Sequence, residues 1–101
     1  MGLKWTTQRT IRKLIEAGET FQLGNIHAEV YERGEWPQFG RMAQIECDRL
    51  KDTVDGQIRT YVVYSYETPI GWTTPTGWYI PDEDYTVTTR HHKNVLKSAI
   101  Q

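Results

Sequence analysis

The segment from residue 59 to residue 80 constrains the fold most, because it joins strand-like runs to a turn of defined geometry. Its first eight residues are dense in β-branched and aromatic side chains, which favour extended backbone. Farther along, Pro75 holds its φ at about −65° and Gly77 accepts a positive φ, so the loop between two further runs is typical of a hairpin. We expect a small antiparallel meander over residues 57–88.

Helical patterns occupy the two ends of the chain. Residues 7–17 carry apolar side chains at helical spacing, and Gly18 is placed to end that helix in a left-handed conformation. Residues 89–99 form a second helical pattern, with Thr88 or Thr89 as its N-cap. Antiparallel strands between terminal helices indicate an α+β fold.

The segment over residues 41–53 is compatible with two structures. As a helix it places Met42 and Ile45 one turn apart on the same face, and this is the interpretation we favour. As a strand over residues 42–48 it directs Ile45 and Cys47 inward instead. The sequence leaves both structures open.

Shorter extended runs complete the pattern. Residues 21–23 and 26–31 are strand-like on either side of Gly24, and Tyr85–Val87 reads as one more short strand. No repeat, linker or low-complexity tract interrupts the chain, and a length of 101 residues suits one modest core. We therefore predict a single domain that comprises the whole chain.

Composition and charge narrow the classes of protein. No apolar run approaches the roughly 20 residues that span a bilayer, so we expect no membrane partner. The one cysteine, Cys47, cannot form an intramolecular disulfide, which fits a reducing, cytosolic compartment. The formal net charge of −1 is unevenly spread, because residues 1–18 and 88–101 each carry +3 and the stretch between them carries −7.

Aromatic residues are the main compositional excess, with twelve rings in 101 residues. A small sheet covered by helices on one face cannot bury them all, and exposed tryptophan and tyrosine concentrate binding energy at protein interfaces. We therefore expect a binding surface on the hairpin, with the two tryptophans facing each other across it: Tyr64, Tyr66, Trp72 and Trp78. The alternative is a core on both faces of the sheet, which would hide these rings.

The basic start of the C-terminal helix suggests two kinds of contact. Arg90 and His92 would complete the aromatic surface as a polar rim. The two basic ends also support a second hypothesis, nucleic-acid binding, provided that the ends converge on one face. The acidic stretch between them weighs against that hypothesis, and the cations equally fit docking onto the protein's own acidic middle.

The sequence contains no arrangement typical of catalysis or metal binding. Ser65 lies inside a predicted strand, without the glycine-flanked turn that exposes a nucleophilic serine. Cys47 has no local signature that pairs it with a histidine. The adjacent His91 and His92 point about 100° apart on a helix, so they are not a typical pair of metal ligands. We expect no enzymatic activity, no cofactor and no metal.

A motif in the second half of the chain resembles a known family. It comprises a nine-residue core, a later tryptophan and a threonine–histidine segment: Tyr64-Ser65-Tyr66-Glu67-Thr68-Pro69-Ile70-Gly71-Trp72, Trp78, and Tyr85-Thr86-Val87-Thr88-Thr89-Arg90-His91-His92. This pattern is similar to that of short, functionally unassigned proteins encoded by tailed bacteriophages of actinobacteria, and the upstream Gly40-Arg41-Met42 matches their Gly-Arg-Leu.

The resemblance implies a phage accessory protein in the host cytoplasm, and it brings no catalytic residue, cofactor or substrate with it. Together with the aromatic excess, it predicts a small non-enzymatic protein that binds a host bacterial protein or a second copy of itself. Nucleic acid is the alternative partner.

Overall fold

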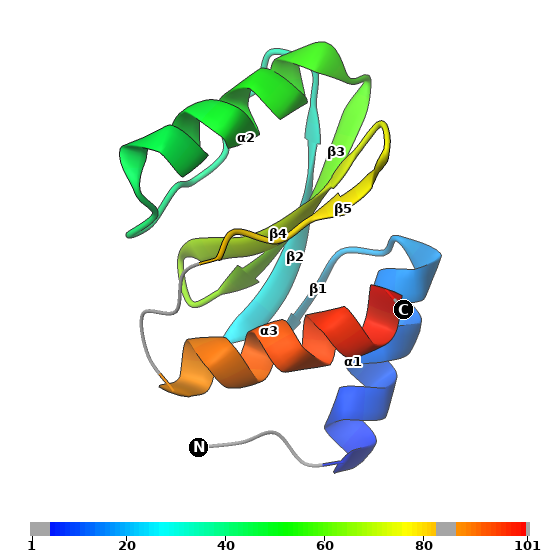
Figure 1. Ribbon diagram of the computed structural model, residues 1–101. Helices are drawn as coiled ribbons and strands as arrows, with labels where there is room; N and C mark the ends of the chain where they lie inside the picture. Colours follow the sequence, from blue (N-terminus) through cyan, green and yellow to red (C-terminus); the bar gives the residue numbers. More distant parts are fainter. Residues whose placement is uncertain (1–4, 83–86, 101) are drawn as a thin grey trace.

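The computed structural model describes residues 5–82 and 87–100. Three helices and five strands follow one another along these residues: α1 (Trp5–Ala17), β1 (Phe21–Leu23), β2 (Ile26–Glu32), α2 (Gln44–Gly56), β3 (Arg59–Ser65), β4 (Thr68–Thr74), β5 (Gly77–Tyr79) and α3 (Val87–Ile100). Figure 1 shows three layers, with α2 on one side of the sheet and α1 and α3 together on the other. The predicted α+β class is confirmed.

The five strands form one antiparallel sheet in chain order, β1-β2-β3-β4-β5. The meander therefore begins at Phe21 and not at residue 57, because β2 pairs with β3 along its whole length, from Ile26 opposite Ser65 to Glu32 opposite Arg59. This pairing makes β3 the central strand, and six of its seven residues are buried.

A bulge in β4 lets this strand contribute to both sides of the sheet. Val63 lies opposite Gly71 and Tyr64 lies opposite Pro69, so Ile70 is an extra residue. Ile70 packs on the side of α1 and α3, whereas Trp72, two residues later, packs under α2. In a regular strand these two side chains would share a face, so the bulge reorients one of them.

Each face of the sheet has its own apolar core. The core beside α1 and α3 contains ten buried residues: Ile11, Ile15, Ile26, Ala28, Tyr61, Val63, Ile70, Val95, Leu96 and Ala99. The core beneath α2 contains seven: Met42, Cys47, Leu50, Val54, Val62, Tyr64 and Trp72. Because helices cover both faces, the strands bury side chains in both directions and the sheet has no apolar face left to solvent.

The terminal helices lie close to their predicted positions. Gly18 follows α1 with a φ of +68° and donates its N–H to the Ile15 carbonyl, which is the expected left-handed C-cap. In the predicted strand Tyr85–Val87, residues 85 and 86 lie outside the described residues. Val87 is the first residue of α3, so its assignment to a strand is wrong.

The ambiguous middle segment is a helix, as favoured, but its buried face differs from the prediction. Because α2 begins only at Gln44, Met42 lies before it and Ile45 is 67% exposed. Cys47, Leu50 and Val54 form the buried stripe. None of the described helices is long and apolar enough to span a membrane.

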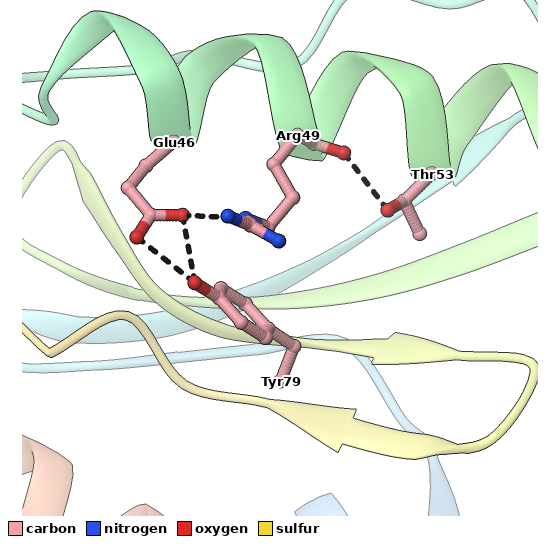
Figure 2. Close-up of polar contacts among 4 residues, drawn as sticks. All are labelled: Glu46, Arg49, Thr53 and Tyr79. Carbon is pink, nitrogen blue, oxygen red and sulfur yellow. Dashed lines mark hydrogen bonds and ion pairs between the residues drawn. The ribbon is translucent and has the colours of Figure 1, made fainter.

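A polar cluster fixes α2 to the edge strand β5. Figure 2 shows the Tyr79 hydroxyl 2.9 Å from each carboxylate oxygen of Glu46, to which it donates its one hydrogen, while the Arg49 Nε donates to the same carboxylate at 3.0 Å. The Arg49 guanidinium also lies 4.9 Å from the centre of the Tyr79 ring. Burial and the neighbouring Glu46 raise the pKa of Tyr79, so its hydroxyl stays protonated as a donor.

Candidate functional site

The aromatic residues predicted to form a binding surface do not lie together at the surface. Tyr64 and Trp72 are enclosed, with 1% and 0% of their area exposed, and Trp78 is half-buried. The physical reason is that α2 covers one face of the sheet while α1 and α3 cover the other. These rings therefore follow the alternative that the sequence left open, in which both faces of the sheet carry a core.

The expected Trp72–Trp78 pair across the hairpin is wrong. The register places Trp72 opposite Tyr79 and Trp78 opposite Thr73, so the two indoles point to opposite faces. Trp72 lies 5.2 Å from the Tyr79 ring on the α2 side. Trp78 meets Tyr61 edge-to-face at 5.8 Å on the other side.

A polar pocket opens at the end of the sheet where the β1–β2 turn, the β3–β4 turn and the loop before α2 meet. Its volume is about 810 Å³, and the described residues that line it are Gln22, Gly24, Asn25, His27, Gln38, Gly40, Arg41, Ser65, Tyr66, Glu67, Thr68 and Thr89. The volume lies within the range of roughly 300–1,000 Å³ that is usual for ligand sites. Amides and hydroxyls dominate this lining, and its two charged residues, Arg41 and Glu67, have opposite signs.

Tyr66 stands on this pocket in a fixed but unfavourable backbone conformation. It is 48% exposed, and its φ of +57° is the one positive φ of a non-glycine residue in the described chain. The Tyr66 N–H donates to the Asn25 carbonyl at 2.7 Å, which ties the β3–β4 turn to the β1–β2 turn. A left-handed conformation costs roughly 1–2 kcal/mol outside glycine and persists only where the surroundings impose it. The backbone that carries the exposed ring is therefore held in place.

Tyr64 lies behind the pocket and supports its wall. Its ring stacks on His27 with centroids 4.7 Å apart, and its hydroxyl donates to the Gln38 carbonyl at 3.1 Å. A hydroxyl has one hydrogen, so the Tyr31 hydroxyl, 2.7 Å away, donates to Tyr64 in turn. Burial raises the pKa of Tyr64 far above its usual range, so the phenol remains a donor at any physiological pH.

His92 also lies beneath the surface, where it fixes α3 to β3. Its Nδ1 is 2.7 Å from the Ser65 Oγ, which is itself 3.3 Å from the Thr89 Oγ1. Burial, followed by the neighbouring His91, lowers the pKa of His92 to about 4, so a neutral imidazole meets the hydroxyl at pH 7. A serine–histidine pair can begin nucleophilic catalysis. Here the two side chains are 1% and 2% exposed, and their hydrogen bond links β3 to α3.

The six residues predicted from the sequence therefore divide into four groups. Tyr66 lines the pocket, and Tyr64 and His92 contact lining residues from behind. Trp72 and Trp78 belong to the two cores, and Arg90 is exposed on the first turn of α3, outside the described lining.

Sequence reasoning missed the rest of the lining, above all His27, Gln38, Gly40 and Arg41. The available signal was a set of turn glycines, since Gly24 and Gly40 both adopt positive φ where two turns meet. Nothing local in the sequence says that these turns converge.

Gly40 sets the close approach between two walls of the pocket. Its φ is +55°, and a Cβ atom there would lie 2.5 Å from the Glu67 carbonyl oxygen and 2.6 Å from the Thr68 Cα. We expect Gly40→Ala to lower the free energy of unfolding by about 2 kcal/mol, from left-handed strain and from displaced backbone. Urea denaturation measures the loss.

Gly24→Ala is the matched control for this substitution. Gly24 has a similar φ of +62°, but a Cβ there has no neighbour within 4 Å, so the expected loss is only about 1 kcal/mol. Equal losses in the two variants would contradict the tight contact between the loop before α2 and the β3–β4 turn.

The pocket's donor set suits hydrogen bonding to a neutral, polar group. In the part of the chain that the structure describes, no three His, Cys, Asp or Glu side chains converge as ligands for a metal ion. Cys47 is buried beneath α2, with its Sγ 3.5 Å from the Met42 carbonyl oxygen.

Comparison with known proteins identifies a family but no function. A model described as a family of unknown function (DUF8033) matches residues 37–99, a span that runs from the loop before α2 almost to the end of α3 and leaves α1, β1 and β2 outside. No curated protein and no solved structure matches the chain. Because the matched span exceeds half of the 101 residues, the chain belongs to the family of unknown function DUF8033.

Proposed function

We propose that this chain is a non-enzymatic binding protein that recognises a polar segment of another protein in the pocket at the end of its sheet. The observation that carries the proposal is Tyr66, an exposed ring held in a strained backbone conformation on the pocket lining. Tyrosine offers a large, rigid contact area with a polar tip, and it is common at interface positions that dominate the binding energy.

The composition of the lining supports a protein partner. Tyrosine, serine, glycine and asparagine, with further amides and hydroxyls, are the residue types that antibody loops use to contact protein surfaces. They are presented by turns at one end of a sheet packed on both faces, which is the usual arrangement of binding loops on a rigid scaffold.

The resemblance of the Tyr64–Trp72 motif to actinobacteriophage proteins supports a phage source. On this proposal the protein acts in the host cytoplasm and its partner is a host bacterial protein. Self-association is the competing mode, and sedimentation velocity over a concentration series distinguishes them: a protein that stays monomeric requires a different partner.

Replacing the exposed ring tests the proposal. Tyr66→Asn removes the ring, while asparagine tolerates the left-handed backbone and so preserves the turn. We expect the protein captured from host lysate by the wild type to bind Tyr66→Asn about thirtyfold more weakly, the loss typical of a residue that dominates an interface. Isothermal titration with the purified partner measures the change.

Trp36→Ala is the matched control, because Trp36 is 71% exposed and is not itself among the described residues that line the pocket. Its affinity should stay within about twofold of the wild type. Unchanged affinity in Tyr66→Asn, or an equal loss in both variants, would remove the pocket from the interface.

A further inference from the structure

A second, smaller pocket lies between the two terminal helices, on the opposite side of the sheet from α2. Its volume is about 210 Å³ and its described lining consists of Gln8, Arg9, Arg12, His91, Asn94, Val95 and Ser98. Figure 1 shows α1 and α3 side by side at this place. The hypothesis of nucleic-acid binding required that the two basic ends of the chain converge. These two helices bring them together.

Helical spacing explains why polar groups gather in this groove. Arg9 and Arg12 are three residues apart on α1 and so share a face. His91, Asn94 and Ser98 follow the same rule on α3. The Gln8 amide nitrogen lies 3.5 Å from the His91 Nε2, which bridges the two helices at one end of the groove.

The charge of the two helices has one sign. Trp5–Ala17 and Val87–Ile100 together contain six lysines and arginines against one acidic residue, Glu16, for a net charge of +5. Lys93 is buried and donates to the Pro81 carbonyl oxygen, whereas the other five cations are exposed, and the rest of the chain is acidic. Guanidinium groups bind phosphate in a two-pronged geometry, and amides and hydroxyls supply further donors to its oxygens.

We infer that the α1–α3 groove binds the phosphate backbone of a nucleic-acid strand. The groove has room for a phosphate group but not for a nucleotide, and the exposed Lys13 and Lys97 stand next to the lining residues Arg12 and Ser98, where they meet the neighbouring phosphates. A membrane surface fits less well, because the large apolar side chains exposed in the described chain are Trp36, Ile45, Ile58 and Tyr66, none of them on these helices. This activity is separate from the pocket that contains Tyr66.

Fluorescence anisotropy with a short labelled single-stranded DNA, repeated with its duplex, tests the inference between about 50 and 200 mM salt. We expect binding whose affinity falls with salt. The double variant Arg9→Gln/Arg12→Gln should weaken it at least about tenfold and make the slope of log K against log salt shallower by about 1–2. Asn94→Asp, an exposed substitution that puts a negative charge into the groove, should weaken binding in the same direction.

Arg33→Gln/Arg59→Gln is the matched control, since it removes the same charge from exposed arginines outside both helices. This control should change affinity less than about twofold. An equal loss in the control would overturn the inference. So would the absence of binding to either DNA at the lowest salt, whether or not inorganic phosphate or anionic vesicles bind. None of these outcomes depends on Tyr66, so failure here leaves the proposed function intact.

Discussion

Replacing Trp72 with alanine is expected to lower the free energy of unfolding by about 3–5 kcal/mol. Trp72 is fully enclosed in the core beneath α2, where it contacts Tyr79, and it is the largest fully buried side chain of the described chain. Truncation removes the ring from this core and leaves a cavity that α2 and the sheet cannot close. Small domains have only about 5–15 kcal/mol of stability, so urea denaturation should show a large fall in the transition midpoint.

Two further substitutions separate the causes of this loss. The Trp72 indole nitrogen is buried without a hydrogen-bond partner among the described atoms, and such a group costs about 1–3 kcal/mol. Trp72→Phe removes that cost while keeping most of the ring, so it should lose less than half as much stability as alanine. Trp36→Ala, with its ring 71% exposed, should lose no more than about 1 kcal/mol. Comparable losses at Trp72 and Trp36 would contradict the buried position of Trp72.

The elements that follow from local spacing were predictable from the sequence. The apolar residues of α1 recur at helical intervals and Gly18 ends it, so both the helix and its end are local properties. The strands of the hairpin follow equally from Pro75 and Gly77 at the turn. For the ambiguous segment before β3 the sequence left a helix and a strand open, and the favoured helix is the one that exists, α2.

The direction in which each side chain points was not predictable, because it depends on contacts between distant segments. The bulge at Ile70 changes which residues of β4 share a face, and no spacing in the sequence marks it. A second helix layer then buries Tyr64 and Trp72, which composition alone suggested as surface groups. The pocket arises in the same non-local way, from turns that Tyr66 and Asn25 join by a single backbone hydrogen bond.

The second large effect is a loss of stability in mild acid that originates at His92. Burial lowers the pKa of His92 to about 4 in the folded protein, against about 6.5 in an unfolded chain. The unfolded state therefore takes up a proton between these values while the folded state does not. The stability contributed by neutral His92 is complete above pH 6.5 and is lost as the pH falls towards 4. A gap of this size corresponds to about 3 kcal/mol, measurable by urea denaturation at a series of pH values.

His92→Asn isolates this contribution from the protonation of carboxylates over the same range. Asparagine retains an acceptor close to the position of Nδ1 for the Ser65 hydroxyl, but it does not titrate. We expect this variant to be less stable than the wild type at pH 7 and to lose less stability between pH 6.5 and pH 4. His91→Asn, at the adjacent half-buried position, removes only the secondary cause of the lowered pKa of His92, so it should keep most of the wild-type pH dependence. Parallel pH curves for the wild type and His92→Asn would mean that His92 titrates normally, and the tie between α3 and β3 would then be open to solvent.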